Sequence, residues 1–327
     1  MSKQKINFGA GVAAFGDSFT NSQGATAPAY GYINRLAASV GGGLANYAVS
    51  GQGTYIAARN GMGAPLRRRN VVAILAGLND ARRAGLAAKD KIVTNLRALI
   101  IINLLASNSL ASSLPRVGAW KVLPSTLVSR SSAKGGSALY TADINAAMTY
   151  KFSGDAFVIG SITTHTLSSS SYQDWDFRVD GGPRQTFENY NLTNEAYSHN
   201  ARIISGLGAG PHTVQILPKS AVPWSVIDYF GVPLAEPKAA GPILVGQIPY
   251  LKNWVYLGFT LTPAIVDELN QAIADMVAEF EGYPVALVRT NDFYNTLTGC
   301  SADGIHPNNT GYAQIYSAFM DKLEIWT

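Results

Sequence analysis

Short apolar runs alternate with segments of helical periodicity in the first 110 residues and again after residue 240. Apolar runs of this length predict buried strands, and the periodic segments between them predict helices. Strands that alternate with helices pair in parallel through right-handed crossovers. The predicted strands are Gly11–Phe15, Ala45–Ala48, Val71–Ala76, Pro242–Gln247 and Pro284–Arg289. The predicted helices are Ala29–Val40, Gly53–Arg59, Lys89–Leu105, Pro263–Phe280 and Thr310–Leu323, the last capped by Asn309 or Thr310.

The middle of the chain has a different pattern, because the helical period disappears from about Ser112 to Pro237. Trp175–Asp180 alternates apolar and charged residues before two glycines, which predicts a half-buried strand entering a hairpin turn. His212–Ile216 alternates in the same way after a glycine-rich turn. Further strands are expected at Tyr150–Ser153 and Phe157–Ile162. Strands separated by such turns favour an antiparallel β-sandwich of jelly-roll type.

These patterns predict two domains. We expect a discontinuous α/β domain, residues 1–111 and 238–327, interrupted by an inserted β-sandwich domain at 112–237. Five parallel strands with helices on both faces form a flavodoxin-like three-layer α/β/α sandwich. An insertion of this size is tolerated when its two ends lie close together, as domain termini often do.

Composition narrows the range of partners. The chain has 327 residues, of which 47% are hydrophobic and 14% charged, with a net charge of +4. Arg67-Arg68-Arg69 is its one basic run, and a nucleic-acid site needs a longer basic stripe with aromatic residues between the charges. We therefore expect no nucleic-acid partner and interpret the run as a solvated surface, with attraction to an acidic substrate as the alternative. No apolar stretch reaches the roughly 18 residues of a membrane span.

Few residues are suited to metals or disulfides. Cys300 is the one cysteine, so the sequence predicts no intrachain disulfide, and four histidines without a Cys/His cluster predict no metal site. We expect no cofactor. Met1–Asn7 lacks the apolar core of a signal peptide, which leaves the localisation unknown: cytoplasmic, phage-borne, exported without a cleaved signal, or recorded without its leader.

Two short motifs contain the candidate catalytic residues. Ser18 follows the apolar run Val12–Phe15 within Phe-Gly-Asp-Ser-Phe, where a strand would end and present a nucleophile. Asp303 and His306 lie three residues apart in Asp-Gly-Ile-His-Pro. A serine hydroxyl becomes a strong nucleophile when a base takes its proton and a third group orients that base. These residues predict Ser18 as nucleophile, His306 as base and Asp303 as its orienting acid; the proximity of Cys300 also admits a Cys–His pair, whereas a packed side chain is the simpler interpretation.

Two further segments make a resemblance specific. Asn-Tyr-Ala-Val-Ser-Gly ends at Gly51, and the strand at Val71–Ala76 leads into Gly-Leu-Asn-Asp, which contains Asn79 and Asp80. With the two motifs above, these blocks resemble those of the SGNH (GDSL) hydrolase superfamily, in the family's order. The resemblance implies the flavodoxin-like fold and assigns the nucleophile role to Ser18.

The resemblance also implies an oxyanion hole, which needs hydrogen-bond donors aimed where negative charge develops. The expected donors are the backbone N–H groups of Ser18 and Gly51 and the side-chain amide of Asn79. Asp17 and Asp80 are expected to be structural supports.

The expected activity is hydrolysis of short-chain esters, with O-deacetylation of a carbohydrate or polysaccharide preferred. The substrate would be an acylated small molecule or a polysaccharide, and homo-oligomer formation is left open. Two alternatives stand beside this expectation. One is a lipase, arylesterase or thioesterase. The other is a carbohydrate-binding protein, of adhesin or phage-tail type, with an esterase core.

Overall fold

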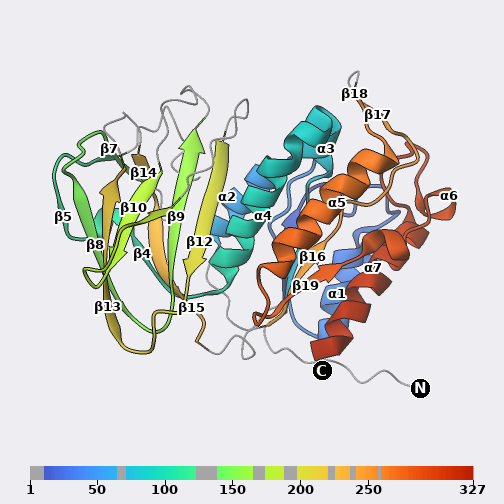
Figure 1. Ribbon diagram of the computed structural model, residues 1–327. Coiled ribbons are helices and arrows are strands. Elements are labelled where there is room, and N and C mark those ends of the chain that lie inside the picture. The colour runs from blue at the N-terminus through green and yellow to red at the C-terminus, as the bar shows by residue number, and fades with distance from the viewer. Residues whose placement is uncertain are drawn as a thin grey trace. The chain divides into compact units, whose positions relative to one another are not determined.

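The computed structural model of the protein describes residues 11–64, 71–122, 138–164, 174–187, 197–219, 225–235, 241–256 and 259–326 (Figure 1). Contacts between Cα atoms divide the chain into two units: residues 1–61, 67–93 and 236–327 form the α/β unit, and residues 62–66 and 94–235 form the β unit. The domain boundaries expected at 111/112 and 237/238 stay a prediction, because a contact unit is not necessarily a part that folds alone.

The α/β unit contains a five-stranded parallel sheet in the order β2-β1-β3-β16-β19. Its strands are β1 Val12–Gly16, β2 Leu44–Asn46, β3 Val71–Leu75, β16 Ile243–Gly246 and β19 Val285–Val288. Counted within this sheet in chain order, the arrangement is 2-1-3-4-5, the flavodoxin-like order. The predicted fold class is confirmed.

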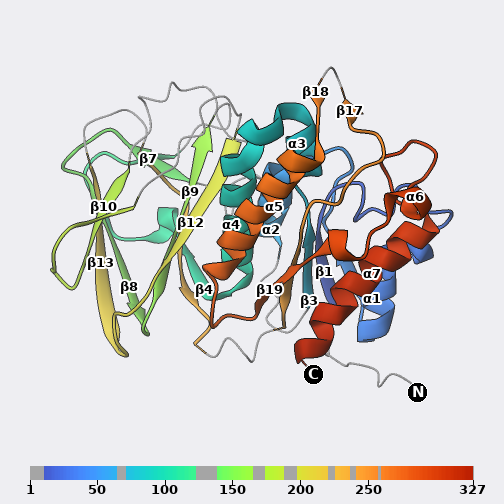
Figure 2. The ribbon, with the colours of Figure 1, turned by 45° about the vertical axis from the view of Figure 1, so that its right-hand side comes forward.

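Helices lie against both faces of this sheet. α1 (Tyr32–Val40) and α7 (Asn309–Leu323) pack on one face, and α5 (Pro263–Ala278) lies on the other (Figures 1 and 2). Every residue of β1, β3 and β16 is buried as a result. Parallel strands that are covered on both faces are continuous apolar runs, which is why the sequence pattern located them.

The α/β unit contains further helices, two of which the sequence pattern predicted at Gly53–Arg59 and Lys89–Leu105. The others, and the short elements named after them, were not predicted. The helices are α2 Thr54–Gly63, α3 Leu78–Ala84, α4 Lys89–Asn103, which continues into the β unit, and α6 Thr296–Gly299. A small hairpin joins β17 Val255–Tyr256 to β18 Phe259–Thr260. Short 3₁₀ turns occur at Pro28–Tyr30, Gly85–Ala88, Thr290–Asp292 and Glu324–Trp326. In the described part of the chain, no helix has the length and apolar character that crossing a bilayer requires.

The cap of α7 corrects one prediction. Asn308 is the N-cap, since its side chain accepts hydrogen bonds from the backbone N–H groups of Thr310 (2.9 Å) and Gly311 (3.0 Å). The sequence pattern placed the cap at Asn309 or Thr310. Adjacent Asn residues are equally good caps, and here the side chain of Asn309 is occupied instead by Thr26 of the N-terminal segment.

The β unit consists of three antiparallel sheets, in the orders β11-β10-β13-β8-β5, β12-β9-β15-β4 and β14-β7-β6. The strands are β4 Leu105–Leu110, β5 Arg116–Val117, β6 Lys121–Val122, β7 Leu139–Thr141, β8 Ala147–Ser153, β9 Phe157–Thr164, β10 Trp175–Val179, β11 Gln185–Phe187, β12 Tyr197–Ile204, β13 Pro211–Pro218, β14 Ser225–Ile227 and β15 Tyr229–Pro233. A 3₁₀ turn at Ala111–Ser113 follows β4. The first two sheets share one apolar core, so the unit is a β-sandwich.

The hairpin predicted after Trp175–Asp180 is present. β10 pairs with β11, and the turn between them has positive φ at Asp180 (50°) and Gly181 (73°). The Gly182 N–H donates to the Val179 carbonyl at 2.9 Å and closes the turn. Positive φ at both central residues defines a type I′ turn, for which Asp-Gly is a preferred sequence.

Candidate active site

Ser18 lies just beyond the carboxyl end of β1. The strand ends at Gly16, where a Cβ would lie 2.4 Å from the Leu75 carbonyl oxygen of the neighbouring strand. Glycine therefore allows the two strand ends to approach closely. Ser18 is buried, at 6% exposure.

His306 reaches Ser18 from the far end of the sequence. Its Nε2 lies 2.9 Å from the Ser18 Oγ, and its Nδ1 lies 2.6 Å from the Asp303 Oδ2. The imidazole packs beside the Phe19 ring, with the ring centroids 5.9 Å apart. The structure thus brings together the three residues predicted as nucleophile, base and orienting acid.

The Asp303 carboxylate is held from several directions. Its Oδ1 accepts hydrogen bonds from the Ser301 hydroxyl (2.8 Å) and from the backbone N–H groups of Ile305 (2.8 Å) and His306 (2.9 Å). Partial burial acts to raise the pKa of Asp303, but these bonds and the one to the imidazole outweigh it and lower the pKa below its ordinary value. A carboxylate that stays ionised can orient His306 and stabilise its protonated form.

The β unit contains a second Asp–His pair, whose other imidazole nitrogen faces a backbone carbonyl and not a hydroxyl. His212 Nδ1 lies 2.6 Å from the Asp180 Oδ2, and its Nε2 lies 3.0 Å from the Gly208 carbonyl oxygen. The bond to Asp180 is the largest cause that raises the pKa of His212. His212 therefore joins two turns of the sandwich, a structural role. Of the other histidines, His199 is buried in β12 and His165 lies outside the described residues.

Cys300 is not placed as a nucleophile, because its Sγ lies 3.0 Å from the Tyr294 hydroxyl and the His306 imidazole is bonded to Ser18. Among the described residues, no three His, Cys, Asp or Glu side chains gather in a way that could hold a metal ion.

The three expected oxyanion donors differ in whether they already donate a hydrogen bond. Within the described part of the chain, the backbone N–H groups of Ser18 and Gly51 donate no hydrogen bond. The Asn79 amide nitrogen already donates to the Gln52 carbonyl (3.0 Å) and to the Asp17 Oδ2 (3.3 Å). Donation by Asn79 to an oxyanion therefore has to replace one of these bonds, and the longer bond to Asp17 is the weaker.

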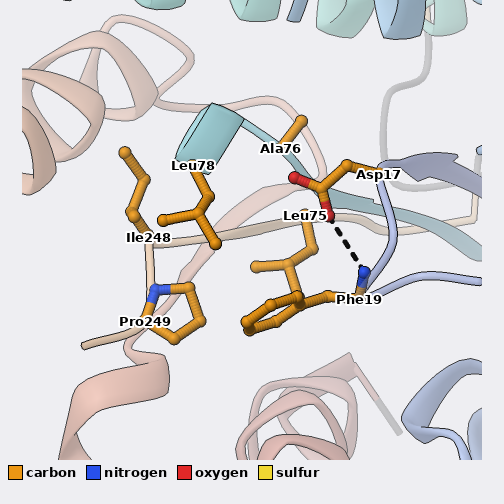
Figure 3. Close-up of a pocket in the computed structure, with 7 residues that line it drawn as sticks. All are labelled: Asp17, Phe19, Leu75, Ala76, Leu78, Ile248 and Pro249. Atoms are coloured by element: carbon orange, nitrogen blue, oxygen red, sulfur yellow. Dashed lines mark hydrogen bonds between the residues drawn. The ribbon is translucent and has the colours of Figure 1, made fainter. Parts of the chain in front are cut away.

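Asp17, the neighbour of Ser18 in the chain, lines a largely apolar pocket. The pocket is lined by Asp17, Phe19, Leu75, Ala76, Leu78, Ile248 and Pro249 (Figure 3). Asp17 is 2% exposed, and its Oδ1 accepts the Phe19 N–H at 3.0 Å. Burial, helped by the negative charge of Asp80, raises the pKa of Asp17 from 3.8 to about 7, against the effect of the Phe19 bond.

Asp80 is also buried, at 2% exposure. Its Oδ2 accepts the Thr54 N–H at 2.6 Å, and its Oδ1 lies 3.2 Å from the Lys91 Nζ. Asp80 thus ties the start of α2 to α3, and its role as a structural support stays a prediction.

We expect Asp17→Asn to stabilise the protein increasingly as the pH rises from about 4 to about 7. In the unfolded chain Asp17 loses its proton near pH 3.8, whereas in the folded protein it keeps the proton to about pH 7. The folded state binds more protons in this window, so the wild-type free energy of unfolding falls as the pH rises through it and stays lower above it. A pKa rise from 3.8 to about 7 corresponds to roughly 4 kcal/mol.

Thermal melts of both proteins across this pH range measure the effect. Asp321→Asn, on the exposed side of α7, is the matched control and should show no comparable gain. An equal gain from Asp17→Asn at both ends of the range would contradict the assignment of the titration to Asp17.

Sequence reasoning missed several residues around the site. Gln52 and Arg83 contact Asn79 and Gly51 respectively, through a backbone carbonyl in each case. No local sequence signal identifies such contacts, because the partners are about 30 positions apart and one partner is main chain. Arg67-Arg68-Arg69, interpreted from the sequence as a solvated surface, lie outside the described residues.

Residues 183–319 match the model of the GDSL-like lipase/acylhydrolase family. The matched stretch includes Asp303 and His306 and begins after Ser18. Among curated protein sequences, none matches this chain.

Several solved structures are similar to parts of the chain. A two-domain esterase active on acetylated mannans, co-crystallised with mannopentaose, is 10% identical, with a TM-score of 0.36 over 69% of this chain and 92% of that one. A family 35 carbohydrate binding module from Clostridium thermocellum is 16% identical, with a TM-score of 0.29 over 39% and 99%. An exo-beta-1,3-galactanase from Phanerochaete chrysosporium is 15% identical, with a TM-score of 0.30 over 38% and 28%. The chain therefore spans little more than a quarter of the galactanase, whose whole activity is not transferred to it.

Proposed function

We propose that this protein, a member of the GDSL-like lipase/acylhydrolase family by its match over residues 183–319, hydrolyses carboxylic esters with Ser18 as the nucleophile. The observation that supports this most is the continuous hydrogen-bonded chain from the Ser18 Oγ through His306 to Asp303, at 2.9 and 2.6 Å. A hydroxyl, an imidazole and a carboxylate in this order form the arrangement that activates serine for acyl transfer.

The proposed reaction has two steps. In the first, the Ser18 Oγ attacks the ester carbonyl carbon while His306 Nε2 takes the hydroxyl proton. The tetrahedral intermediate then collapses, His306 donates the proton to the departing alcohol oxygen, and the acyl group stays on Ser18. In the second step water attacks the acyl-enzyme with His306 again as base, which releases the carboxylic acid and restores Ser18. Asp303 stabilises the protonated imidazole in both steps without taking its proton.

The oxyanion of the intermediate would be bound by the backbone N–H groups of Ser18 and Gly51, together with the Asn79 amide. The first two N–H groups donate to no other described residue, so they can donate to the oxyanion without breaking a bond within this part of the chain. Fixed donors of this kind need no reorganisation when charge develops, which is the source of their catalytic effect.

We infer that the preferred substrates are short acyl esters, above all acetyl esters on a polysaccharide. The pocket that contains Asp17 and Phe19 is lined mainly by apolar side chains, among them Leu75 and Ile248. A chain with 14% charged residues and a β-sandwich unit fits a neutral polymeric alcohol better than a charged one.

A series of nitrophenyl esters from acetyl to lauroyl, with acetate release from O-acetylated polysaccharides, tests this proposal. We expect kcat/KM to be highest for acetyl and to fall as the chain lengthens. A maximum at a long acyl chain would indicate a lipase, and preference for a thioester would indicate a thioesterase. Hydrolysis of nitrophenyl acetate without acetate release from any polysaccharide would leave an arylesterase on small substrates.

The Ser18→Ala protein tests the carbohydrate-binding alternative. If the protein mainly binds glycans, this variant should bind deacetylated and acetylated polysaccharides equally well in a titration. If it is mainly an esterase, we expect binding to depend on the acetyl groups.

A further inference from the structure

The short helix α3 holds the segment that contains Gly51 at three points. The Asn79 amide donates to the Gln52 carbonyl at 3.0 Å, and the Asp80 carboxylate accepts the Thr54 N–H at 2.6 Å. Arg83 Nη2 donates to the Gly51 carbonyl oxygen at 2.6 Å. Each contact is between a side chain of α3 and the main chain of the segment, so α3 sets the backbone path on which Gly51 lies.

Arg83 differs from the other two residues of this clamp. Asn79 and Asp80 belong to the Gly-Leu-Asn-Asp motif and are buried, whereas Arg83 lies one helical turn further on and is exposed. Its partner is the carbonyl of the residue whose N–H group is a proposed oxyanion donor. A hydrogen bond from a charged guanidinium is stronger than one between neutral groups.

Gly51 needs such an external restraint. Its φ is +74°, and no atom of the described residues outside its chain neighbours lies within 4 Å of the position that a Cβ would occupy, so no packed side chain of its own restrains its backbone. Glycine also has more conformational freedom than any other residue. A donor that stabilises the transition state must keep its direction, and a misplacement of about 1 Å can reduce the rate about 100-fold.

We propose that Arg83 is a positioning residue, whose bond to the Gly51 carbonyl keeps the Gly51 N–H directed at the oxyanion. This inference rests on the proposed function. Arg83 does not touch the reacting atoms, so its effect reaches the transition state through the backbone of Gly51.

The test is steady-state hydrolysis of nitrophenyl acetate by Arg83→Ala. We expect kcat to fall about 10- to 100-fold while KM stays within about twofold, because the interaction acts in the transition state and not in ground-state binding. Millimolar guanidinium should restore part of kcat, and Arg83→Lys should lie between Arg83→Ala and the wild type. An arylboronic acid, which forms a tetrahedral adduct on serine, should bind Arg83→Ala more weakly by a similar factor.

Arg35→Ala is the matched control. Arg35 also donates from its side chain to an exposed backbone carbonyl, that of Tyr30 at 2.9 Å, and its loss should leave kcat unchanged. Circular dichroism and thermal melts verify folding, and Arg83→Gln takes the place of Arg83→Ala if the latter does not fold.

Two results would overturn the inference about Arg83. An unchanged kcat in Arg83→Ala would show that Gly51 is held without it. A raised KM with unchanged kcat and no rescue would make Arg83 a substrate-binding residue. Failure of the proposed function is a separate result, namely substantial activity in Ser18→Ala.

Discussion

Ser18→Ala and His306→Ala should each abolish ester hydrolysis, with losses in kcat of roughly 10⁴- to 10⁶-fold, and the double variant should be little worse than either one. The reason is the geometry of the site: the Ser18 hydroxyl can lose its proton to one base, and that base lies 2.9 Å away. Groups that act in one step lose their whole contribution when either is removed. Single-turnover and steady-state kinetics on nitrophenyl acetate measure these losses.

The second Asp–His pair provides a matched control. His212 is bonded to Asp180 as His306 is bonded to Asp303, but its other nitrogen faces a carbonyl. His212→Ala should therefore affect the stability of the β unit and leave kcat of the folded protein near that of the wild type. Losses that add up in the double variant of Ser18 and His306 would show that the two residues do not act as a unit.

Asn79→Ala should lower kcat by roughly 10²- to 10³-fold, with a smaller effect on KM. The amide can give up its 3.3 Å bond to Asp17 and donate to the oxyanion while it keeps its 3.0 Å bond to Gln52. An interaction made in the transition state alone affects kcat and kcat/KM together. The same kinetic measurements detect this pattern.

Asn103→Ala is the control for Asn79. Asn103 also donates its amide to a backbone carbonyl, that of Leu99 at 2.8 Å, and it lies in the β unit. Its loss should not change kcat. If Asn79→Ala raised KM and left kcat unchanged, Asn79 would bind substrate in its ground state and the oxyanion hole would need another donor.

The sequence predicted the parallel sheet well because its strands are buried on both faces. Val71–Ala76 is an uninterrupted apolar run and Pro242–Gln247 contains the apolar run Ile243–Val245, and the structure has strands at β3 and β16. Leu105–Leu110 is a strand, β4, that was not predicted, since it follows α4 almost directly and Leu-Ala-Ser-Asn-Ser-Leu has no strict alternation. Its pairing with β15, more than 100 positions later, is a long-range contact that no local pattern contains.

The difference between local patterns and long-range contacts also explains which parts of the site could be predicted from the sequence. Ser18, Asp303 and His306 are located by short motifs, since each follows a strand or a glycine-bounded turn. The hydrogen bond that Asn79 already makes to Asp17 and the contact of Arg83 with Gly51 depend on how α3 is oriented against its neighbouring segments. Side-chain direction across a helix and the path of a loop are fixed by packing, which a motif does not record.

The nucleophile and its base are 288 positions apart along the chain. At about 5–20 residues per second, a ribosome would synthesise Ser18 roughly 15 to 60 seconds before His306. A nascent chain with β1 already formed would have a serine without a base, and it would not hydrolyse esters. Ester turnover would then report a single event in biogenesis, the docking of the Asp303–His306 loop against the end of β1, and its return during refolding would time that long-range contact directly.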